Sequence, residues 1–346
     1  MPIDLFQILS TEKNFRQDQV FRAWFDVNTD SYEKITTLPK ELREKLESLP
    51  WMSVKLKIMQ DSKIDQTWRA LLELSDGEMV ETVLMGRVSK KEFSEDESRF
   101  TICISSQVGC PMNCSFCATG CSGFKRNLSK EEIVDQVRFW NYFIVEKFDE
   151  KISNIVMMGQ GEPLLNYDNV RDALNIVLEN TEIGPTKITI STVGVPPTMD
   201  RLPEDRYFPP VRLAISLHSA INDTRKKLIP SHSSDFFDFM LVWIKKYAER
   251  FSSRSHFIGF EYIMLNGVND DEKHLKALIK FLSKMGHLRI NLIPYNSSDD
   301  AIFKSSPDVT IKVWQESLMK AGFTCTIRHS QGQDIFAACG QLRNSI

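Results

Sequence analysis

The sequence has no run of about 18 apolar residues, so it predicts no membrane-spanning helix. The apolar start is interrupted by Glu12 and Lys13, so we expect no secretory signal there. Low-complexity tracts and short repeats are also missing. Neither sign of charge is in large excess, because the formal net charge of the 346 residues is only −3. A protein with this balance that binds nucleic acid would need local basic patches.

Cysteine is present in an odd number, seven, in a chain of ordinary composition with 42% hydrophobic and 26% charged residues. Without an export signal, such thiols are expected in a reducing compartment, where they are used chemically rather than paired in disulfides. We therefore expect a soluble protein of the cytoplasm. Nothing in the sequence requires more than a monomer.

The first third of the chain divides into two regions. Residues 1–64 carry helical patterns, and Pro39 suits the first turn of a helix. Residues 65–99 hold two extended runs around Ser75, Asp76 and Gly77, which is a strong hairpin signal. The sequence thus predicts a small helical domain over 1–64 and a β-hairpin extension over 65–99.

From residue 100 to 346, short apolar runs alternate with longer amphipathic patterns. This alternation is typical of βαβ units and predicts an α/β fold with a parallel sheet. The expected strands are 101–107, 154–159, 187–192, 211–217, 257–265 and 289–295, and the expected helices are 130–147, 168–180, 235–250, 271–285 and 308–322. Ser129 and Glu132 have the spacing of a capping box before the first helix. Six units fit either a partial (β/α)6 barrel or a doubly wound sheet.

Polar and glycine residues gather where the expected strands end, which is the rim that carries the chemistry in parallel α/β proteins. Three cysteines, Cys110, Cys114 and Cys117, follow the first of these strands. Inert burial is a poor explanation for three cysteines within eight positions. Zinc is a better one, although Cys121 is too close for ordinary paired zinc spacing. Three thiolates also suit a four-iron cluster, and they would leave one iron open to a substrate or cofactor.

The C-x3-C-x2-C spacing, with Phe116 before the last cysteine, resembles the signature of the radical S-adenosylmethionine (SAM) enzymes. The resemblance implies a [4Fe–4S] cluster whose open iron is chelated by SAM. It also implies an external electron donor, such as a flavodoxin or a ferredoxin. One electron passed through the cluster would then cleave SAM into methionine and a 5′-deoxyadenosyl radical.

Further motifs resemble the RlmN/Cfr family of radical SAM methyltransferases, which methylate adenosine in RNA. The similarity runs from about residue 78 to residue 343. It includes "MMGQGEPLLN" (157–166), "STVGVPP" (191–197), "AISLHS" (214–219), "EYIMLNGVND" (261–270), "NLIPYN" (291–296) and "AACGQLR" (337–343). The family has a partial radical SAM barrel and a small N-terminal accessory domain that binds RNA.

The resemblance implies roles for three side chains that otherwise look unrelated. Cys339 would be methylated by one SAM, and the radical from a second SAM would then activate that methyl group for attack on the base. Glu81 would remove the proton from the attacked carbon, and Cys103 would release the product by forming a disulfide with Cys339. Two SAM molecules are therefore expected for each turnover.

The same resemblance implies a set of SAM contacts. These are Gly161, Glu162, Ser191, Ser216, Leu217, His218 and Asn296. Two basic segments after rim loops are expected to contact RNA phosphates. They contain Lys125, Arg126, Lys130, Arg225, Lys226 and Lys227.

The family has two branches, and the motifs favour one of them. "GQGEPLLN" and the double alanine before Cys339 resemble the RlmN branch, which methylates carbon 2 of adenosine in 23S ribosomal RNA and, in some members, in transfer RNA. The alternative is the Cfr branch, which methylates carbon 8 and confers antibiotic resistance. A non-catalytic iron–sulfur protein that binds RNA is a more distant alternative. Gln160, Cys121 and Cys325 are given no role.

Overall fold

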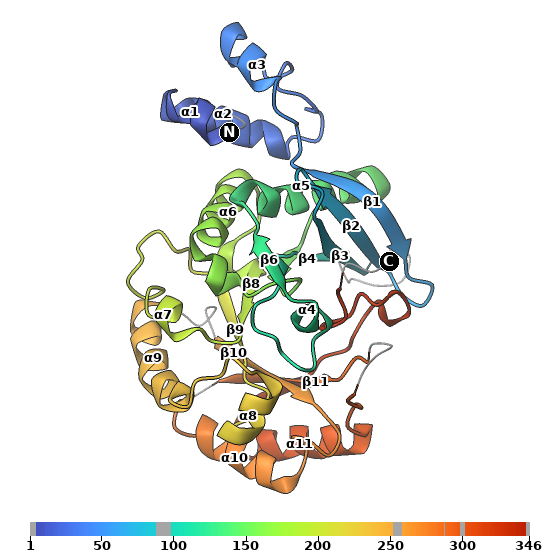
Figure 1. Cartoon of the computed structure of the whole chain (residues 1–346), viewed down its shortest axis with the longest axis vertical. Helices are drawn as coiled ribbons and strands as arrows, with labels where there is room; N and C mark the ends of the chain where they lie inside the picture. Colours follow the sequence, from blue (N-terminus) through green and yellow to red (C-terminus); the bar gives the residue numbers. More distant parts are fainter. Residues whose placement is uncertain (1–4, 88–97, 252–257, 287, 298–301, 344–346) are drawn as a thin grey trace.

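The computed structural model describes residues 5–87, 98–251, 258–286, 288–297 and 302–343. Its centre is a curved mixed sheet, with a group of three helices at one end of the molecule (Figure 1). These helices are α1 (Leu5–Ser10), α2 (Asn14–Phe25) and α3 (Lys40–Leu46). Within the described ranges no helix is both long and apolar enough to cross a bilayer.

One half of the sheet is antiparallel. It consists of β1 (Val54–Asp61), β2 (Thr67–Leu74) and β3 (Met79–Arg87), and β3 pairs in turn with β4 (Arg99–Cys103). The hairpin predicted around Gly77 is confirmed, since Gly77 lies between β2 and β3 with φ +83°. The helical prediction was wrong for 54–61, because this segment pairs with β2 and forms the edge of the sheet.

The other half of the sheet is parallel, and each strand pairs with the strand of this sheet that follows it along the chain. After β4 come β7 (Asn154–Met157), β8 (Ile188–Thr192), β9 (Arg212–Ser216), β10 (Ile258–Met264), β11 (Arg289–Pro294) and β12 (Thr324–Ile327). Because the order never reverses, the doubly wound alternative is excluded. In the described part of the chain β12 does not pair with β1, so the sheet is an open, partial barrel.

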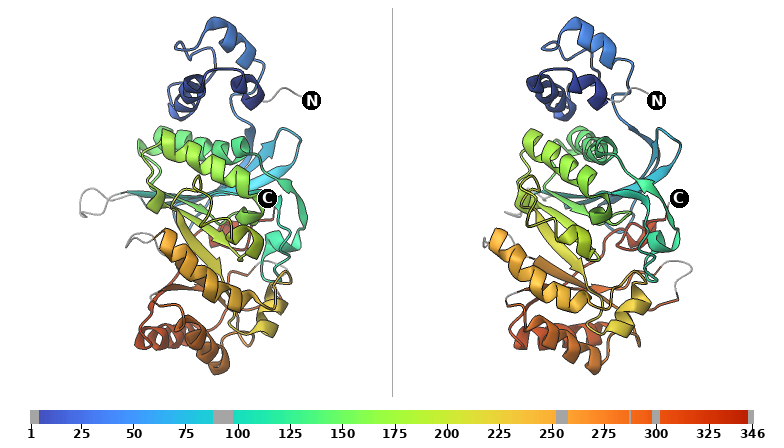
Figure 2. Two further views of the ribbon diagram at one scale, coloured as in Figure 1. Left: turned by 90° about the vertical axis from the view of Figure 1, so that its left-hand side faces the viewer. Right: turned by 60° about the vertical axis from the view of Figure 1, so that its left-hand side comes forward.

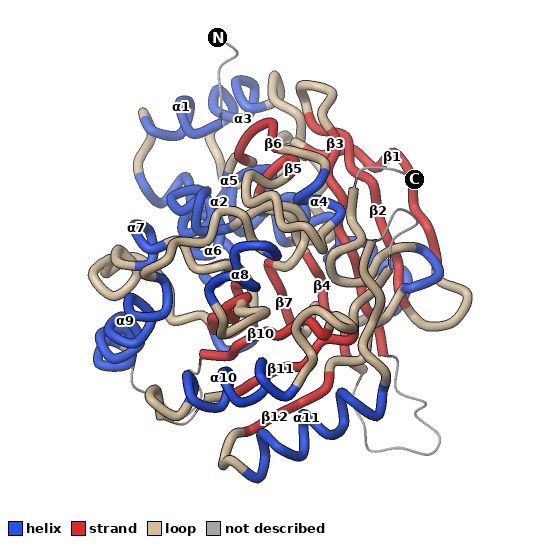
Figure 3. Tube along the Cα trace, turned by 60° about the horizontal axis from the view of Figure 1, so that its bottom comes forward, coloured by secondary structure: helices blue, strands red, loops and turns tan. Residues whose placement is uncertain are grey.

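Helices follow the parallel strands and lie around the outside of the curved sheet (Figures 2 and 3). They are α5 (Lys130–Phe148), α6 (Tyr167–Asn180), α7 (Pro196–Met199), α8 (Asn222–Leu228), α9 (Phe236–Arg250), α10 (Glu272–Leu282) and α11 (Asp308–Lys320). The six predicted strand–helix units are thus confirmed. The capping box of α5 is also present, with Ser129 and Glu132 each accepting a hydrogen bond from the other's backbone.

The strand predicted over 101–107 is split between two observed strands, because β4 ends at Cys103 and a new strand begins at Gln107. The chain leaves the main sheet after Cys103, and β5 (Gln107–Gly109) pairs instead with β6 (Phe124–Asn127) in a separate two-stranded sheet. The cysteine loop and α4 (Ala118–Cys121) lie between these two strands. Single 3₁₀ turns occur at Pro163–Asn166, Pro185–Lys187 and Gln333–Ile335.

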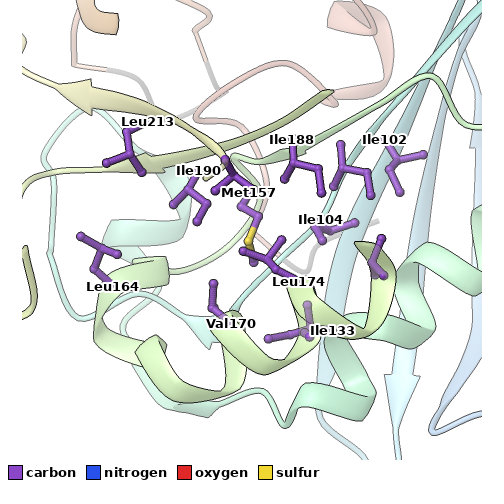
Figure 4. Packing of buried hydrophobic residues seen from close by; sticks show 14 of the residues in the cluster. Ile102, Ile104, Ile133, Met157, Leu164, Val170, Leu174, Ile188, Ile190 and Leu213 are labelled. Atoms are coloured by element: carbon purple, nitrogen blue, oxygen red, sulfur yellow. The ribbon is translucent and has the colours of Figure 1, made fainter. Parts of the chain in front are cut away.

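The hydrophobic core lies between the parallel strands and the outer helices. Figure 4 shows Ile102, Met157, Ile188 and Ile190 from the strands facing Ile133 of α5 and Val170 and Leu174 of α6. Full burial of each such side chain stabilises the fold by about 1.5–3 kcal/mol. The same apolar cluster continues into the N-terminal helices through Leu9 and Trp24, so these helices pack on the barrel rather than hang from a linker.

Arg138 of α5 attaches the N-terminal region to the barrel. Its guanidinium lies 4.6 Å from the ring centre of Trp24 and 4.8 Å from that of Trp51, and it forms a buried ion pair with Asp135. Asp135 in turn accepts hydrogen bonds from the backbone N–H and the hydroxyl of Ser53. One cation therefore joins two aromatic rings of the N-terminal region to the first barrel helix.

We expect Arg138→Gln to lower the free energy of unfolding by about 3–5 kcal/mol, because Asp135 would remain buried without its cationic partner. Urea unfolding followed by circular dichroism measures this. The control is Lys40→Gln, which removes an exposed pair with Glu44 and should cost at most about 0.5 kcal/mol. An equal loss of unfolding free energy in the two variants would contradict the role of Arg138 in attaching the N-terminal region.

Candidate active site

Three thiols converge in the loop between β5 and β6. Burial raises the pKa of Cys110 to about 12 and raises the pKa of Cys114 and Cys117 as well. A charge on Cys117 raises the pKa of both other thiols further, so the three sulfur atoms act on one another. Burial alone makes three free thiolates unfavourable, and a positively charged metal group among them would reverse this effect.

The backbone of this loop permits few substitutions. Gly109 has φ +74°, and a Cβ on it would lie 2.0 Å from the carbonyl oxygen of Gly123. A Cβ on Gly120 would lie 2.8 Å from the backbone nitrogen of Cys114. The Cys117 N–H donates to the Cys114 carbonyl at 3.1 Å. These close approaches fix the path of the chain from one cysteine to the next.

The donor set fits an iron–sulfur cluster better than a single ion. In the described part of the chain, no three His, Cys, Asp or Glu side chains come close enough together to hold one metal ion. The ligands of a four-iron cluster bind different irons and stand further apart than the ligands of one zinc ion. Three thiolates on one short loop suit such a cluster, which would keep its fourth iron open.

A cavity opens beside the cysteine loop at the carboxyl ends of the parallel strands. Its volume is about 140 Å³, and it is partly open to solvent. Its walls include Cys117, Gly161, Glu162, Ser191, Ser216, His218 and Cys339. The predicted convergence of strand ends from distant parts of the sequence is therefore present.

Gly161 and Glu162 follow β7 and form one side of this cavity. Gly161 has φ +105°, and a Cβ on it would lie 2.6 Å from the Gln107 side chain. Glu162 is buried, and its carboxylate accepts hydrogen bonds from the N–H of Leu164 at 3.0 Å and of Val193 at 2.8 Å. Burial raises the pKa of Glu162. The carboxylate thus links the end of β7 to the end of β8 and keeps lone pairs for a cationic ligand.

Ser191 and Ser216 lie at the ends of β8 and β9, with their hydroxyl oxygens 3.4 Å apart. His218 follows with φ +58° and accepts a hydrogen bond at Nδ1 from the N–H of Ile263 at 3.1 Å. Burial lowers the pKa of His218 to about 3. Its imidazole is therefore neutral, and the other ring nitrogen carries the proton, which it can donate to a ligand.

Two predicted SAM contacts do not line this cavity. The Leu217 side chain is fully buried in the main hydrophobic core, so only its backbone is near the site. Asn296 lies instead beside the C-terminal loop, where its amide nitrogen is 3.4 Å from the Cys339 carbonyl oxygen. It also accepts a hydrogen bond from Gln333 at 3.0 Å.

A second, smaller cavity of about 70 Å³ adjoins the first, and Cys339 lines both. Cys103 at the end of β4 lines the second cavity. Burial raises the pKa of Cys103 to about 12, and the charge of Cys339 contributes to this increase. Cys339 is an exposed residue of the C-terminal loop, yet desolvation of its sulfur where it faces the cavities raises its pKa, and the charge of Cys117 adds to this increase. Cys339 therefore shares one cavity with Cys117 and the other with Cys103.

The C-terminal loop is held in place by the segment after Cys117 on one side and by β2 on the other. The Ala118 N–H donates to the Gly340 carbonyl at 2.8 Å, and the Thr119 hydroxyl donates to the Leu342 carbonyl at 2.6 Å. On the other side Arg69 donates to the Ile335 carbonyl at 2.9 Å. These bonds close the open side of the barrel next to the cavity (Figure 1).

Glu81 lies on β3, fully buried in an ion pair with Arg69. Its second oxygen accepts a hydrogen bond from the Arg343 N–H at 2.9 Å, four residues beyond Cys339. It lines neither cavity. Glu81 is thus next to the loop that carries Cys339, and its described contacts are those of a structural carboxylate.

Sequence reasoning did not identify Arg328 and Glu261. Arg328 follows β12, lines both cavities and donates to Glu261 at 3.1 Å. It lowers the pKa of Cys339, whereas Glu261 raises it. The Oε2 atom of Glu261 is buried and has no hydrogen-bond partner among the described residues, although Glu261 faces the larger cavity. The sequence did offer one signal for Glu261, which is a carboxylate in the middle of an otherwise apolar strand.

One predicted phosphate contact was wrong, and others are already paired. Arg225 is buried and cannot reach RNA at the surface. Lys125 pairs with Glu78 at 2.7 Å, and Arg126 pairs with Asp76 and Glu132. Lys130 lies over the Phe6 ring, 3.3 Å from its centre. Lys226 and Lys227 on α8 are exposed.

The comparison with known proteins defines the class. A family model described as the radical SAM superfamily matches residues 104–279, and the chain belongs to that superfamily. Over nearly its whole length it is also similar to a radical SAM methyltransferase from Sphaerobacter thermophilus. That crystal structure is 34% identical with a TM-score of 0.85, and the match covers 97% of this chain and 95% of the other. The chain therefore belongs to the family of that methyltransferase.

Two further solved structures match parts of the chain. A domain of the pyruvate-formate lyase-activating enzyme from Bacteroides vulgatus is 19% identical, with a TM-score of 0.40 over 51% of this chain and 99% of that one. SuiB from Streptococcus suis bound to S-adenosylmethionine is 13% identical, with a TM-score of 0.46, and the match covers 65% of this chain and 49% of that one.

We expect Gly161→Ala to weaken SAM binding to the cluster-loaded protein at least about tenfold, equivalent to ~1.4 kcal/mol. The added Cβ would displace Gln107, which accepts the Glu162 N–H at 2.8 Å. Equilibrium binding of SAM measures this. Gly77→Ala is the matched control, since Gly77 also has positive φ but a Cβ there meets nothing within 4 Å. Equal weakening by both substitutions would contradict the assigned SAM site.

Proposed function

We propose that this protein methylates carbon 2 of an adenosine in 23S ribosomal RNA, with transfer RNA as a second substrate to be tested. The motifs of the RlmN branch suggest the base and the RNA. The observation that carries the proposal is the position of Cys339, which lines two cavities, with Cys117 at one and Cys103 at the other. A protein that only binds RNA has no use for two thiols placed in this way.

In this proposal Cys339 is the methyl carrier. Carbon 2 of adenine is electron-poor and cannot attack the methyl group of SAM, whereas a thiolate can. The sulfur of Cys339 takes the methyl group, and the S-adenosylhomocysteine formed leaves the site. The cluster and a second SAM supply the radical that removes one hydrogen atom from this methyl group. Arg328 lowers the pKa of Cys339 and so favours the thiolate that begins the cycle.

Cys103 is the resolving thiol. Once the carbon attached to Cys339 has bonded to the base, the resulting base radical must lose one electron, which the cluster would take back, and the proton of carbon 2. The thiolate of Cys103 then attacks the Cys339 sulfur. The carbon–sulfur bond breaks, a Cys103–Cys339 disulfide forms, and the released carbon is protonated to give the methyl product. An external thiol reductant must reduce the disulfide before the next turnover. Because the pKa of Cys103 is raised to about 12, deprotonation of Cys103 has to be assisted.

Glu81 is the proposed acceptor of the proton from carbon 2. Support comes from its hydrogen bond to the Arg343 N–H, which brings it to the loop of Cys339. Proton transfer would require the ion pair with Arg69 to loosen when RNA binds, because this pair is fully buried. For phosphate contact, Lys226 and Lys227 are the best candidates on α8. We place this chemistry in the cytoplasm, where thiols and the cluster remain reduced.

The direct experiment is mass spectrometry of nucleosides from RNA treated anaerobically with the reconstituted protein, SAM and a reductant. Unmodified 23S fragments and transfer RNA serve as parallel substrates. We expect 2-methyladenosine. Carbon 8 methylation would assign the protein to the Cfr branch instead. SAM cleavage without any methylated adenosine would contradict the RNA substrate, and no cleavage by a protein with an intact cluster would favour the non-catalytic alternative.

We expect Cys339→Ala to reduce product formation at least about 100-fold while keeping its iron. Cys103→Ala should instead accumulate a covalent protein–RNA adduct, because the carbon–sulfur bond can no longer be broken. Denaturing gels with labelled RNA and iron analysis distinguish the two variants. Cys325→Ala is the matched control, because Cys325 is a buried cysteine of β12 that lines neither cavity. Normal turnover by Cys103→Ala would exclude its role as resolving thiol.

A further inference from the structure

Arg225 is a buried cation whose described hydrogen-bond partners are all neutral. Its side chain is 1% exposed and lies 3.6 Å from the ring centre of Phe236. The guanidinium donates to the carbonyl oxygens of Val193 at 2.6 Å, Ser216 at 3.2 Å and Leu217 at 3.1 Å. Three strand-end carbonyls from β8 and β9 therefore surround a single positive charge.

The fourth partner of Arg225 is His232, which is also neutral. His232 Nδ1 lies 2.6 Å from the guanidinium, and its Nε2 lies 2.8 Å from the side-chain oxygen of Asn222. Because a guanidinium only donates, Nδ1 accepts and Nε2 carries the proton. Burial and the Arg225 charge lower the pKa of His232 to about 4, which agrees with a neutral ring.

No carboxylate forms an ion pair with Arg225 among the residues that the structure describes. Arg69 and Arg138 are buried to the same degree, and each is paired with an acidic side chain. Burial of a charge without a partner is costly. Accordingly, burial lowers the pKa of Arg225 to about 9.

The loop of the three cysteines packs on the helix that carries Arg225. Cys114 and Met112 lie in one apolar cluster with Leu228 and Ile229, and Met112 and Arg225 line the same small cavity. The cysteine loop rests directly on α8, where the Ser115 N–H donates to the Leu228 carbonyl at 3.0 Å. Ser231 also contacts Met112 at 3.4 Å. Arg225 therefore lies under the loop that holds the three thiols.

We propose that Arg225 is the buried counter-charge of the iron–sulfur cluster, with the cluster taking the place of the carboxylate that other buried arginines have. Three thiolates give the cluster site a negative charge that the described residues around Arg225 do not supply. Arg225 is thus a positioning residue that joins the cluster to the SAM contacts. Its partner Val193 donates to Glu162, and its partner Ser216 lines the cavity.

Two consequences follow from a buried cation at this place. The cation stabilises the folded protein more when the cluster is present than when it is absent. It also favours addition of an electron to the cluster, so its removal should shift the reduction potential to a more negative value. Neither consequence depends on the RNA substrate, although both rest on the cluster site.

The test compares thermal unfolding of the full chain without iron and after reconstitution, for the wild type, Arg225→Gln and Arg225→Lys. Arg171→Gln serves as control, because Arg171 of the outer helix α6 is ion-paired to Asp172 and Asp205. We expect the cluster to raise the melting temperature of the wild type and of Arg171→Gln equally, and to raise that of Arg225→Gln by less. Lysine keeps the charge and should restore most of the increase.

The reduction potential gives a second readout. At a fixed applied potential, the ratio of reduced to oxidised cluster should fall about tenfold in Arg225→Gln, which corresponds to ~59 mV for one electron. Loss of iron from Arg225→Gln but not from Arg225→Lys would also support the proposal. Equal increases in melting temperature in all variants, iron loss from both variants, or unfolding of iron-free Arg225→Gln would overturn it. A wild-type chain that takes up no cluster would refute the cluster site itself.

Discussion

The position of the C-terminal loop depends on its hydrogen bonds to the cysteine loop, and the candidate active site depends on that position. Ala118 and Thr119, directly after the last cluster cysteine, bind the carbonyls of Gly340 and Leu342. Since the sheet is an open barrel, its side would otherwise be accessible to water. The loop covers this side and places Cys339 where the two cavities meet. A segment more than 200 residues away in the sequence thereby becomes a neighbour of the cluster.

Burial dominates the electrostatics of the site. It raises the pKa of the cluster cysteines and of Cys103, and it lowers the pKa of His218 and Arg225. Each of these shifts disfavours the charged form of a group in a low-dielectric interior. The arrangement becomes favourable when opposite charges are brought together, as thiolates with iron and a guanidinium with the cluster. The apolar surroundings that strengthen such pairs also exclude water from a radical reaction.

Much of this architecture could be predicted from the sequence, since strand–helix alternation and strand-end motifs are local patterns. The helical prediction for 54–61 was wrong because β1 is held by its pairing with β2, which local sequence does not reveal. Basic composition likewise does not distinguish a surface cation from a buried one, and Arg225 was misassigned for that reason. Leu217 shares a motif with His218, yet its side chain is buried in the main hydrophobic core. The place of Arg328 at both cavities also required the fold.

The central claim is that Cys339 carries the methyl group between SAM and the substrate. The most direct measurement is peptide mass spectrometry of the cluster-loaded protein after incubation with SAM that bears an isotopically labelled methyl group. We expect one labelled methyl group on the peptide that contains Cys339 and none on the peptide that contains Cys103. A labelled Cys103, or an unmodified Cys339 in a protein that methylates RNA, would contradict this claim.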